Sequence, residues 1–382
     1  MTQNADPPTT GAADRPVRPR LFYVDHLRVV LTVLVVLHHA AITYGNIPVW
    51  YLAEPAQDPS GAALDLFVLL NQTFFMGMFF LIAGYFVPGS IDRRGRRGFM
   101  RERLIRLGVP LLLFLVLLRP LALIPTFGQV MAAEPDLPLW LLYLLTIDPG
   151  PMWFVEVLLV MSLVYVWVRG VRERRAGPVR VVEKVRERGP LRWPVPVLVF
   201  VVGSALVTFA WRWAFPAPYW PVVGLPSPGY LPQYVAMFTV GALAYRGDWL
   251  HRLPDRAGVV GGIAAVVTLP VMMVFATAAP DTGASLVRLL AENLFSVGLV
   301  LALLVFFRRF VTRDNRVWRF LGDNAFAVYV LHTVVLVLVA MALGGWQAPA
   351  VVKFAGLAAL SVPLSWVSAA GVRAIPGVKR VL

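Results

Sequence analysis

Long apolar blocks recur along the whole chain, and short polar stretches separate them. Several blocks run for about 20 residues, which is the length of α-helix needed to cross a hydrocarbon core of roughly 30 Å. Their residues are continuously apolar, without the strict alternation of polarity that marks the strands of a membrane β-barrel. The pattern therefore predicts an all-α polytopic membrane protein.

We expect about ten transmembrane helices, with no internal repeat and no soluble domain between them. The predicted spans lie near residues 24–44, 63–87, 107–127, 151–168, 195–215, 230–246, 258–278, 288–307, 323–343 and 350–372. Residues 1–20 are polar and rich in proline, which predicts a disordered N-terminal segment. Residues 21–373 form the predicted membrane domain, and residues 374–382 form a short basic tail.

The amino-acid composition agrees with lipid surroundings. Of the 382 residues, 58% are hydrophobic and 15% are charged, whereas a soluble protein carries about 25% charged residues. The chain contains no cysteine, which excludes disulfides, thiol nucleophiles and thiolate metal sites. We predict neither a metal site nor a permanently bound cofactor.

The formal net charge of +14 follows the same segmentation. Lysine and arginine gather in segments 15–20, 93–106, 169–192, 246–256, 308–319 and 373–380, whereas connections 45–62, 128–150, 216–229, 279–287 and 344–349 contain neither residue. Basic connections stay in the cytoplasm. Both termini are therefore predicted to be cytoplasmic, in a multi-pass protein of the plasma (inner) membrane, and nucleic acid is not an expected partner.

Ionisable residues interrupt the first span, at Asp25, Arg28, His38 and His39. Such residues are costly in hydrocarbon and usually face a protein interior or a wet cavity. At about 100° per residue, Arg28 and His39 lie about 20° apart on the helix, whereas His38 points about 80° from Arg28. Asp25, Arg28 and His39 thus share one stripe, which is either functional or a structural Asp–Arg pair with a histidine bonded between helices.

Polar residues also mark the second and fourth spans. Asp65 and Gln72 are seven residues apart and share a helix face, and Gly84 further along allows a neighbouring helix to approach closely. Glu156 lies one turn inside the fourth span. These side chains are candidate pocket or catalytic groups.

The ninth span carries the sequence LGDNAFAVYVLH. Asp323 and Asn324 resemble the residues that begin a helix. Tyr329 and His332 lie inside the membrane, one turn apart, and are candidate pocket residues.

Three further charges lie in or near spans. Arg119 is deep enough to require a carboxylate partner or a wet pocket. Arg288 and Lys353 lie close to span ends, where long side chains can reach the interface.

The basic segment RRGRRGFMRERLIRLGVP holds Arg101, Arg103 and Arg106, of which the last two share one helix surface. Guanidinium pairs suit phosphate groups, with which they form bidentate hydrogen bonds. The segment is therefore either a phosphate-binding group or a plain topology signal. The basic segment 169–192 is either another topology anchor or a short helix on anionic headgroups.

Five stretches together resemble the acyltransferase-3 family of integral membrane acyltransferases. They are VDHLRVVLTVLVVLHH, FFLIAGYF, RLIRLGVPLLL, WFVEVLL and LGDNAFAVYVLHT, which span residues 23 to about 335. Their order and spacing carry the resemblance more than any single stretch does. The third and fourth stretches are closer to the glucan-succinylating branch than to the O-antigen acetylating branch.

The resemblance implies that the chain transfers an acyl group, of acetyl or succinyl type, from cytoplasmic acyl-CoA to a hydroxyl of a carbohydrate or cell-envelope acceptor. It implies His39 as the general base, with Asp25, Arg28 and Glu156 in the same catalytic group. The three arginines of the basic segment would then hold the CoA phosphates. Direct transfer is the expected route, because no serine motif suggests an acyl-enzyme, and an acyl-histidine relay stays open.

Two other functions are compatible with parts of the pattern. Intramembrane carboxylates and histidines also form the proton relay of a transporter for small or glycan-like solutes. Against it stand the missing repeat and the arginine cluster, which suits a phosphate-bearing donor. A purely structural or sensor protein leaves the stripe on the first span unexplained.

Overall fold

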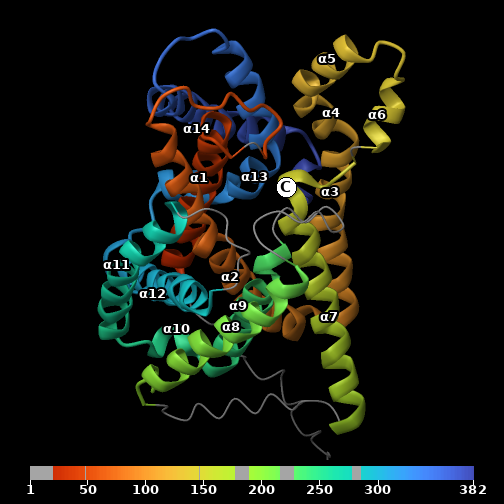
Figure 1. Ribbon diagram of the computed structural model, residues 1–382. Coiled ribbons are helices and arrows are strands. Elements are labelled where there is room, and N and C mark those ends of the chain that lie inside the picture. The colour runs from red at the N-terminus through yellow and green to blue at the C-terminus, as the bar shows by residue number, and fades with distance from the viewer. Residues whose placement is uncertain (1–19, 48, 146, 177–188, 216–227, 278–284) are drawn as a thin grey trace, which may run out of the picture.

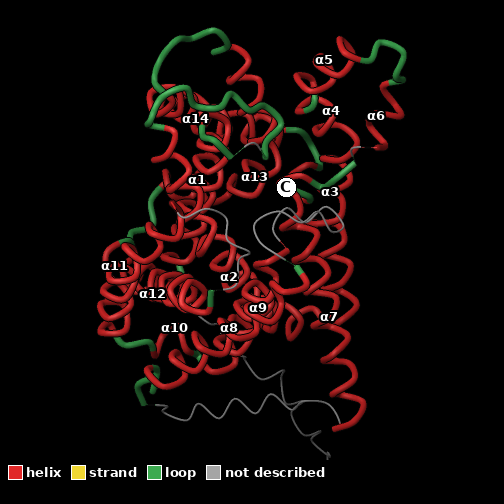
Figure 2. The backbone as a smooth tube through the Cα atoms, viewed as in Figure 1, coloured by secondary structure: helices red, strands yellow, loops and turns green. Residues whose placement is uncertain are grey.

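The computed structural model describes residues 20–47, 49–145, 147–176, 189–215, 228–277 and 285–382. Within these ranges every regular element is a helix (Figures 1 and 2). The α-helices are α1 (Phe22–Tyr44), α2 (Gly61–Arg103), α3 (Val109–Leu113), α4 (Arg119–Ala122), α5 (Ile124–Ala133), α6 (Leu139–Leu145), α7 (Trp153–Ala176), α8 (Pro194–Ala214), α9 (Leu231–Gly247), α10 (Trp249–Arg252), α11 (Asp255–Thr277), α12 (Leu286–Phe310), α13 (Arg316–Ala342) and α14 (Ala350–Ala374). The predicted all-α class is confirmed for the described part of the chain.

Eight helical segments among the described residues are long and apolar enough to cross a membrane. One of them, Gly61–Ala122, has 62 residues, about three times the length that one span requires. The chain is therefore a multi-pass membrane protein. The number of ten spans and the cytoplasmic position of both termini stay predictions.

The long segment that begins with α2 kinks at Gly95, where φ is 71° and ψ is 170°. This conformation is essentially restricted to glycine, because a Cβ clashes there. The basic stretch 93–106, expected as a connection, is instead helical on both sides of this kink. The second span likewise continues beyond residue 87, its predicted end.

After the kink, two π-helical turns interrupt the chain, at Leu104–Gly108 and Phe114–Leu118. Each turn comes just before a proline, Pro110 or Pro120. A proline ring lacks the N–H of the helical hydrogen bond and clashes with the carbonyl four residues earlier. The wider π turn relieves this clash without ending the helix.

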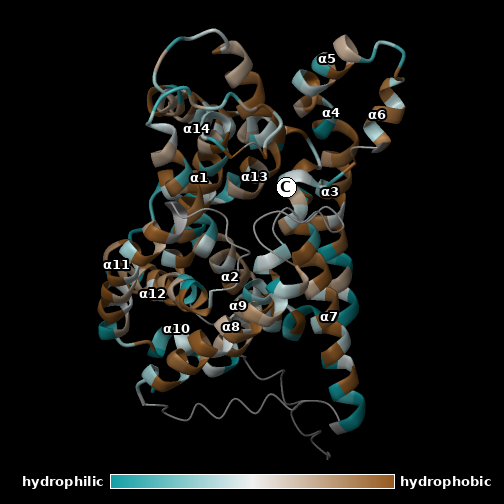
Figure 3. Ribbon diagram, in the orientation of Figure 1, coloured by the Kyte–Doolittle hydropathy of each residue, from teal (hydrophilic) through white to brown (hydrophobic). Residues whose placement is uncertain are grey.

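Helix α1 lies inside the bundle, against α2, α12, α13 and α14 (Figure 1). Its Leu31 is fully buried, whereas the surface of the bundle is apolar: Trp213 and Val266 are 76% and 69% exposed. Figure 3 shows hydrophobic residues along the outward sides of helices such as α11. Polar side chains such as His332 are buried instead. This inside-out distribution fits lipid surroundings.

Helices α2 and α9 approach closely at two glycines. A Cβ on Gly84 of α2 would overlap the carbonyl oxygen of Phe238 on α9, and a Cβ on Gly241 would overlap that of Leu81. The close approach predicted at Gly84 is thus confirmed. These contacts fix the distance between α9 and α2, and α2 in turn packs against α1.

Two boundaries differ from the sequence prediction. Helix α13 begins at Arg316 rather than near Asp323, because the side chain of Asn315 accepts a hydrogen bond from the backbone N–H of Trp318. The connection 128–150 contains α6 and most of α5. The predicted disordered segment lies outside the described residues except for Arg20, as do residues 177–188 of the long basic connection.

Candidate functional site

His39 of α1 and His332 of α13 lie in contact, although 293 positions separate them in the sequence. The Nε2 atom of His332 is 3.2 Å from Nδ1 of His39, and the ring centroids are 5.1 Å apart. His332 is completely buried and His39 is half-buried. The pairing follows from the packing of α1 against α13.

Two aromatic residues surround this histidine pair. The indole of Trp50, in the connection between α1 and α2, stacks on His39 with a centroid distance of 4.1 Å and an angle of 26°. Tyr329, one turn before His332, donates its hydroxyl hydrogen to the carbonyl of Pro151. The pair is therefore enclosed by residues from three separate parts of the chain.

His38, the neighbour of His39, faces a different surrounding. Nδ2 of Asn71 on α2 donates to Nδ1 of His38 at 3.3 Å, and the His38 ring lies 5.0 Å from that of Phe75. The planes of the two adjacent imidazoles are perpendicular. His38 is thus a buried side chain between α1 and α2, while His39 faces α13.

The hydrogen bond of His39 to its own helix defines which ring nitrogen is basic. Nδ1 of His39 is 2.9 Å from the carbonyl oxygen of Val35. A carbonyl only accepts, so Nδ1 carries the hydrogen of the neutral ring and Nε2 holds the lone pair. No residue in the described part of the chain donates to this Nε2. The arrangement leaves one nitrogen available to take a proton.

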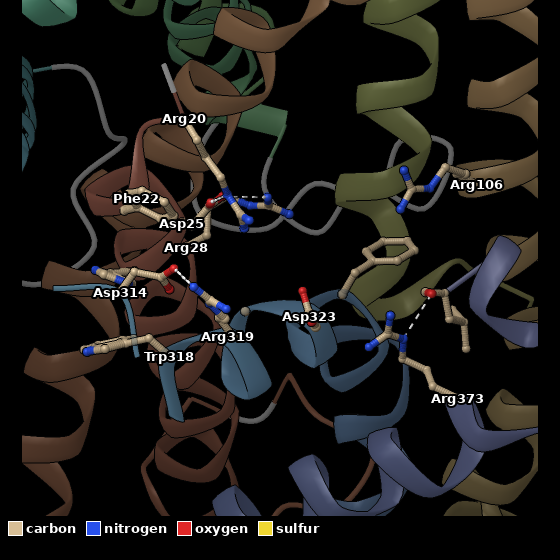
Figure 4. A pocket seen from close by; sticks show the side chains of 14 residues that line it. Arg20, Phe22, Asp25, Arg28, Arg106, Asp314, Trp318, Arg319, Asp323 and Arg373 are labelled. Atoms are coloured by element: carbon tan, nitrogen blue, oxygen red, sulfur yellow. Dashed lines mark hydrogen bonds and ion pairs between the residues drawn. The ribbon is translucent and has the colours of Figure 1, made fainter. Parts of the chain in front are cut away.

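A polar cavity of about 230 Å³ lies at the other end of α1 (Figure 4). Its charged lining comprises five arginines and three aspartates: Arg20, Arg28, Arg106, Arg319, Arg373, Asp25, Asp314 and Asp323. Arg20 lies just before α1, and Asp314 lies just before α13. The others come from α1, the π turn after α2, the first part of α13 and the end of α14. We call this group the basic cavity.

Part of the charge in the basic cavity is already paired. Asp25 accepts from Nε of Arg20 at 2.8 Å and lies 3.8 Å from the guanidinium of Arg28. Asp314 accepts two hydrogen bonds from Arg319, at 2.8 and 2.5 Å. These bonds lower the pKa of the Asp314 carboxyl, which is therefore ionised at neutral pH.

Arg373 and Arg106 have no aspartate or glutamate partner among the residues that line the cavity. Arg373 donates to Oδ1 of Asn324 at 2.9 Å and to the backbone oxygen of Leu382 at 3.2 Å. Arg106 has a partner outside the lining, the carboxylate of Glu102 at 3.6 Å. With five arginines against three aspartates, the lining is net positive and suits an anionic group such as phosphate.

The other two arginines of the predicted phosphate-binding segment do not line the basic cavity. Arg101 is exposed to the surroundings, and the guanidinium of Arg103 lies over the ring of Phe99 at 5.0 Å. The structure thus brings Asp25, Arg28 and Arg106 together and leaves Arg101 and Arg103 aside.

Asp65 and Gln72 lie in other surroundings than the histidine pair. Asp65 accepts from the backbone N–H and the side-chain amide of Asn46, both at 2.8 Å, and so ties the turn after α1 to α2. Gln72 donates to the hydroxyl of Tyr234 on α9 at 2.9 Å. Both side chains connect helices through hydrogen bonds.

Glu156 lies in the first turn of α7, and its Oε2 atom is buried without a hydrogen-bond partner among the described residues. The ring of Phe154, two residues earlier, lies 5.9 Å from that of Tyr329. This turn of α7 therefore adjoins the part of α13 that carries His332. A buried carboxylate without a partner is costly and is often functional.

Three residues of these sites, Trp50, Arg319 and Arg373, are not predicted as site residues from the sequence. Trp50 lies in an irregular connection where no periodicity indicates its direction. The two arginines belong to basic segments that the topology already explains, so nothing in the sequence separates them from the other cations. Only the packing of α1, α13 and α14 identifies them.

Ion pairs account for most of the other charges inside the bundle. Buried Arg119 bonds Asp148 at 2.8 Å, the carboxylate that its depth requires. Arg212 and Glu292 form a buried pair at 2.8 Å, and Arg288 bonds the second oxygen of Glu292 at 2.9 Å. Among the described residues, no group of three or more His, Asp or Glu is arranged to hold a metal ion.

Comparison with known proteins gives one match. Residues 21–370 match a protein family described as an acyltransferase domain. The matched range includes every helix from α1 to nearly the end of α14, and so contains both the histidine pair and most of the basic cavity. No curated protein and no solved structure matches the chain.

Proposed function

Because the chain belongs to the acyltransferase-3 family, which makes it an acyl-transferring enzyme of the membrane, we propose that it moves an acyl group from cytoplasmic acyl-CoA to a hydroxyl of a carbohydrate or glycoside. The observation that carries this proposal is that the two halves of α1 contribute to different sites. Arg28 lines the basic cavity, and His39 lies about 16 Å further along the same helix.

The basic cavity supports the donor side of the reaction. Acyl-CoA carries several phosphates at one end and its thioester at the end of a long flexible arm. Arg28, Arg106 and Arg373 would hold the phosphates through charge-assisted hydrogen bonds, while the arm extends along α1 toward His39. The donor is a substrate that enters and leaves, so no cofactor is bound permanently.

The tautomer of His39 supports the chemical step. Nε2 takes the proton of the acceptor hydroxyl while the hydroxyl oxygen attacks the thioester carbonyl carbon. A carbon–oxygen ester bond forms, the carbon–sulfur bond breaks, and Nε2 returns the proton to the leaving thiolate. The products are an acylated acceptor and free CoA, and no acyl-histidine intermediate is required.

The remaining catalytic and substrate assignments are part of the same proposal. Asp25 fixes Arg28 beside the cavity, and Glu156 and Tyr329 lie near the acceptor. The donor is acetyl- or succinyl-CoA and the acceptor is a carbohydrate of the cell envelope, which accords with the resemblance to the glucan-succinylating branch. The enzyme would act in the plasma membrane.

Mass spectrometry of envelope glycans and small glycosides tests the proposal most directly. Cells that contain the protein should show glycans heavier by one acyl group than cells that lack it. Purified protein in lipid nanodiscs should release free CoA from isotope-labelled acetyl- or succinyl-CoA when such glycans are added, and the label should appear in the glycan as an ester.

Unmodified glycans in cells, together with no CoA release from either donor, would overturn the proposal. Proton-coupled uptake of a glycoside by vesicles that contain the protein would then favour the transporter function.

A further inference from the structure

The hydrogen bonds of His332 define which of its ring nitrogens carries the hydrogen, and His332 has no role in the proposed step. Its Nδ1 lies 2.6 Å from the carbonyl oxygen of Tyr329. Because a carbonyl only accepts, Nδ1 of the neutral ring carries the hydrogen and Nε2 holds the lone pair. This lone pair is directed at His39, with 3.2 Å between Nε2 of His332 and Nδ1 of His39.

The two rings therefore form an ordered chain of donors and acceptors. The Nδ1 hydrogen of His39 is shared between the carbonyl of Val35 and Nε2 of His332. The Nδ1 hydrogen of His332 goes to the backbone carbonyl of Tyr329. Both nitrogens of His332 and Nδ1 of His39 therefore have hydrogen-bond partners. Within the described part of the chain, Nε2 of His39 is the nitrogen that keeps a free lone pair.

We infer that His332 is a positioning residue, which orients the imidazole of His39 and stabilises the positive charge that His39 acquires when it takes the acceptor's proton. This inference rests on the proposed function. When Nε2 of His39 is protonated, its Nδ1–H becomes a donor of a charged group, and Nε2 of His332 accepts it. Such charge-assisted hydrogen bonds are roughly twice as strong as neutral ones.

The position of His332 fits this role better than a packing role alone. Its ring is completely buried, where an unsatisfied polar nitrogen is costly. The Val35 carbonyl belongs to the same helix as His39 and fixes only which nitrogen carries hydrogen. His332 belongs to another helix, so its bond fixes the direction in which Nε2 of His39 points relative to α13.

Replacement of His332 by leucine and by glutamine tests the inference with purified protein in nanodiscs. Leucine removes the acceptor, so kcat should fall roughly ten- to a hundredfold while the KM for acyl-CoA stays within about twofold of wild type. The side-chain oxygen of glutamine can reach the position of Nε2, so His332→Gln should recover most of the lost kcat.

Thr333→Val is the matched control. Thr333 is also completely buried on α13, and its hydroxyl has no hydrogen-bond partner among the described residues. Valine has nearly the same shape, so this variant should keep wild-type kcat, KM and melting temperature.

The outcomes separate the two proposals. A wild-type protein that transfers no acyl group defeats the proposed function itself. An active wild type whose kcat is unchanged in His332→Leu overturns the inference alone. Equal losses in His332→Leu and His332→Gln, with lower melting temperatures in both, would assign His332 to packing and would also overturn it.

Discussion

The arginines of the basic cavity differ in how closely they pair with carboxylates of the protein. Arg319 gives two short hydrogen bonds to Asp314, and Arg20 binds Asp25 at 2.8 Å. Among the described residues, Arg373 bonds Asn324 and the backbone oxygen of Leu382 and no aspartate or glutamate, and Arg106 has a carboxylate at 3.6 Å. An incoming phosphate would therefore interact most favourably with the last two.

The difference between Arg106 and Arg103 gives a prediction at the residue scale. Arg106→Gln should raise the KM for acyl-CoA roughly ten- to a hundredfold, because a charge-assisted contact contributes about 1.5–3 kcal/mol. Arg103→Gln is the control, since Arg103 lies over Phe99 outside the cavity. Steady-state kinetics with varied donor concentration measure both; equal KM values in the two variants would contradict a phosphate role for Arg106.

A second residue-scale prediction concerns the two adjacent histidines. His39→Ala should insert into the membrane normally and lose about 10²–10⁴-fold in kcat, the usual contribution of a general base. His38 bonds Asn71 on the opposite side of α1, so His38→Gln should lose far less. Labelled acyl transfer at matched expression measures both variants. A stronger loss in the His38 variant would show that the wrong histidine was assigned.

At the scale of elements, helix spacing depends on positions where no side chain fits. The contact of α2 with α9 at Gly84 and Gly241 brings backbone against backbone, which raises the van der Waals contact between the helices. In contrast, Gly203 of α8 has no heavy atom within 4 Å of the position its Cβ would take. Replacement of glycine by alanine should therefore lower the stability of the protein at Gly84 but not at Gly203.

Gly84→Ala should lower the melting temperature in detergent, because the added methyl group forces α2 from α9 and overpacking costs about 1–3 kcal/mol. Gly203→Ala should be neutral or stabilising by about 0.4–1 kcal/mol, because alanine reduces the freedom of the unfolded chain. Thermal unfolding followed by fluorescence compares them. Unchanged stability in Gly84→Ala would mean that the two helices tolerate a wider separation.

At the scale of the whole molecule, the decisive question is how many times the chain crosses the membrane. Helix α9 has 17 residues and rises about 26 Å, slightly less than the hydrocarbon thickness. If α9 crosses, five membrane-spanning helices, α7, α8, α9, α11 and α12, separate residues 128–150 from residues 308–319. Residues 128–150 and 308–319 then lie on opposite sides of the membrane.

Single-cysteine variants test this topology, because the chain has no cysteine of its own. Ala132 and Thr312 are exposed and lie in the two connections. A membrane-impermeant thiol reagent should label Ala132→Cys on intact cells, and should label Thr312→Cys only after permeabilisation. Labelling of both from outside would mean that α9 does not cross the membrane. It would also contradict a cytoplasmic position of the basic cavity.

The sequence by itself determined the class of the protein and the directions of side chains on single helices. Span length and the alternation of basic and uncharged connections are read along the chain, so they need no knowledge of neighbours. The angle between adjacent residues likewise predicted that His38 and His39 face apart, as α2 and α13 confirm. Helix α1 could therefore be recognised as the most informative segment.

The tertiary structure decided which side chains meet. A helical wheel gives the direction of His39 but not the helix that lies there, so His332 and Trp50 became its neighbours only through packing. For the same reason Gln72 faces Tyr234 rather than the histidine pair. In the sequence Arg373 is one cation among many, and only the packing of α14 places it in the lining of the same cavity as Arg28. Contacts between such distant segments depend on the fit of whole helices, which no local pattern encodes.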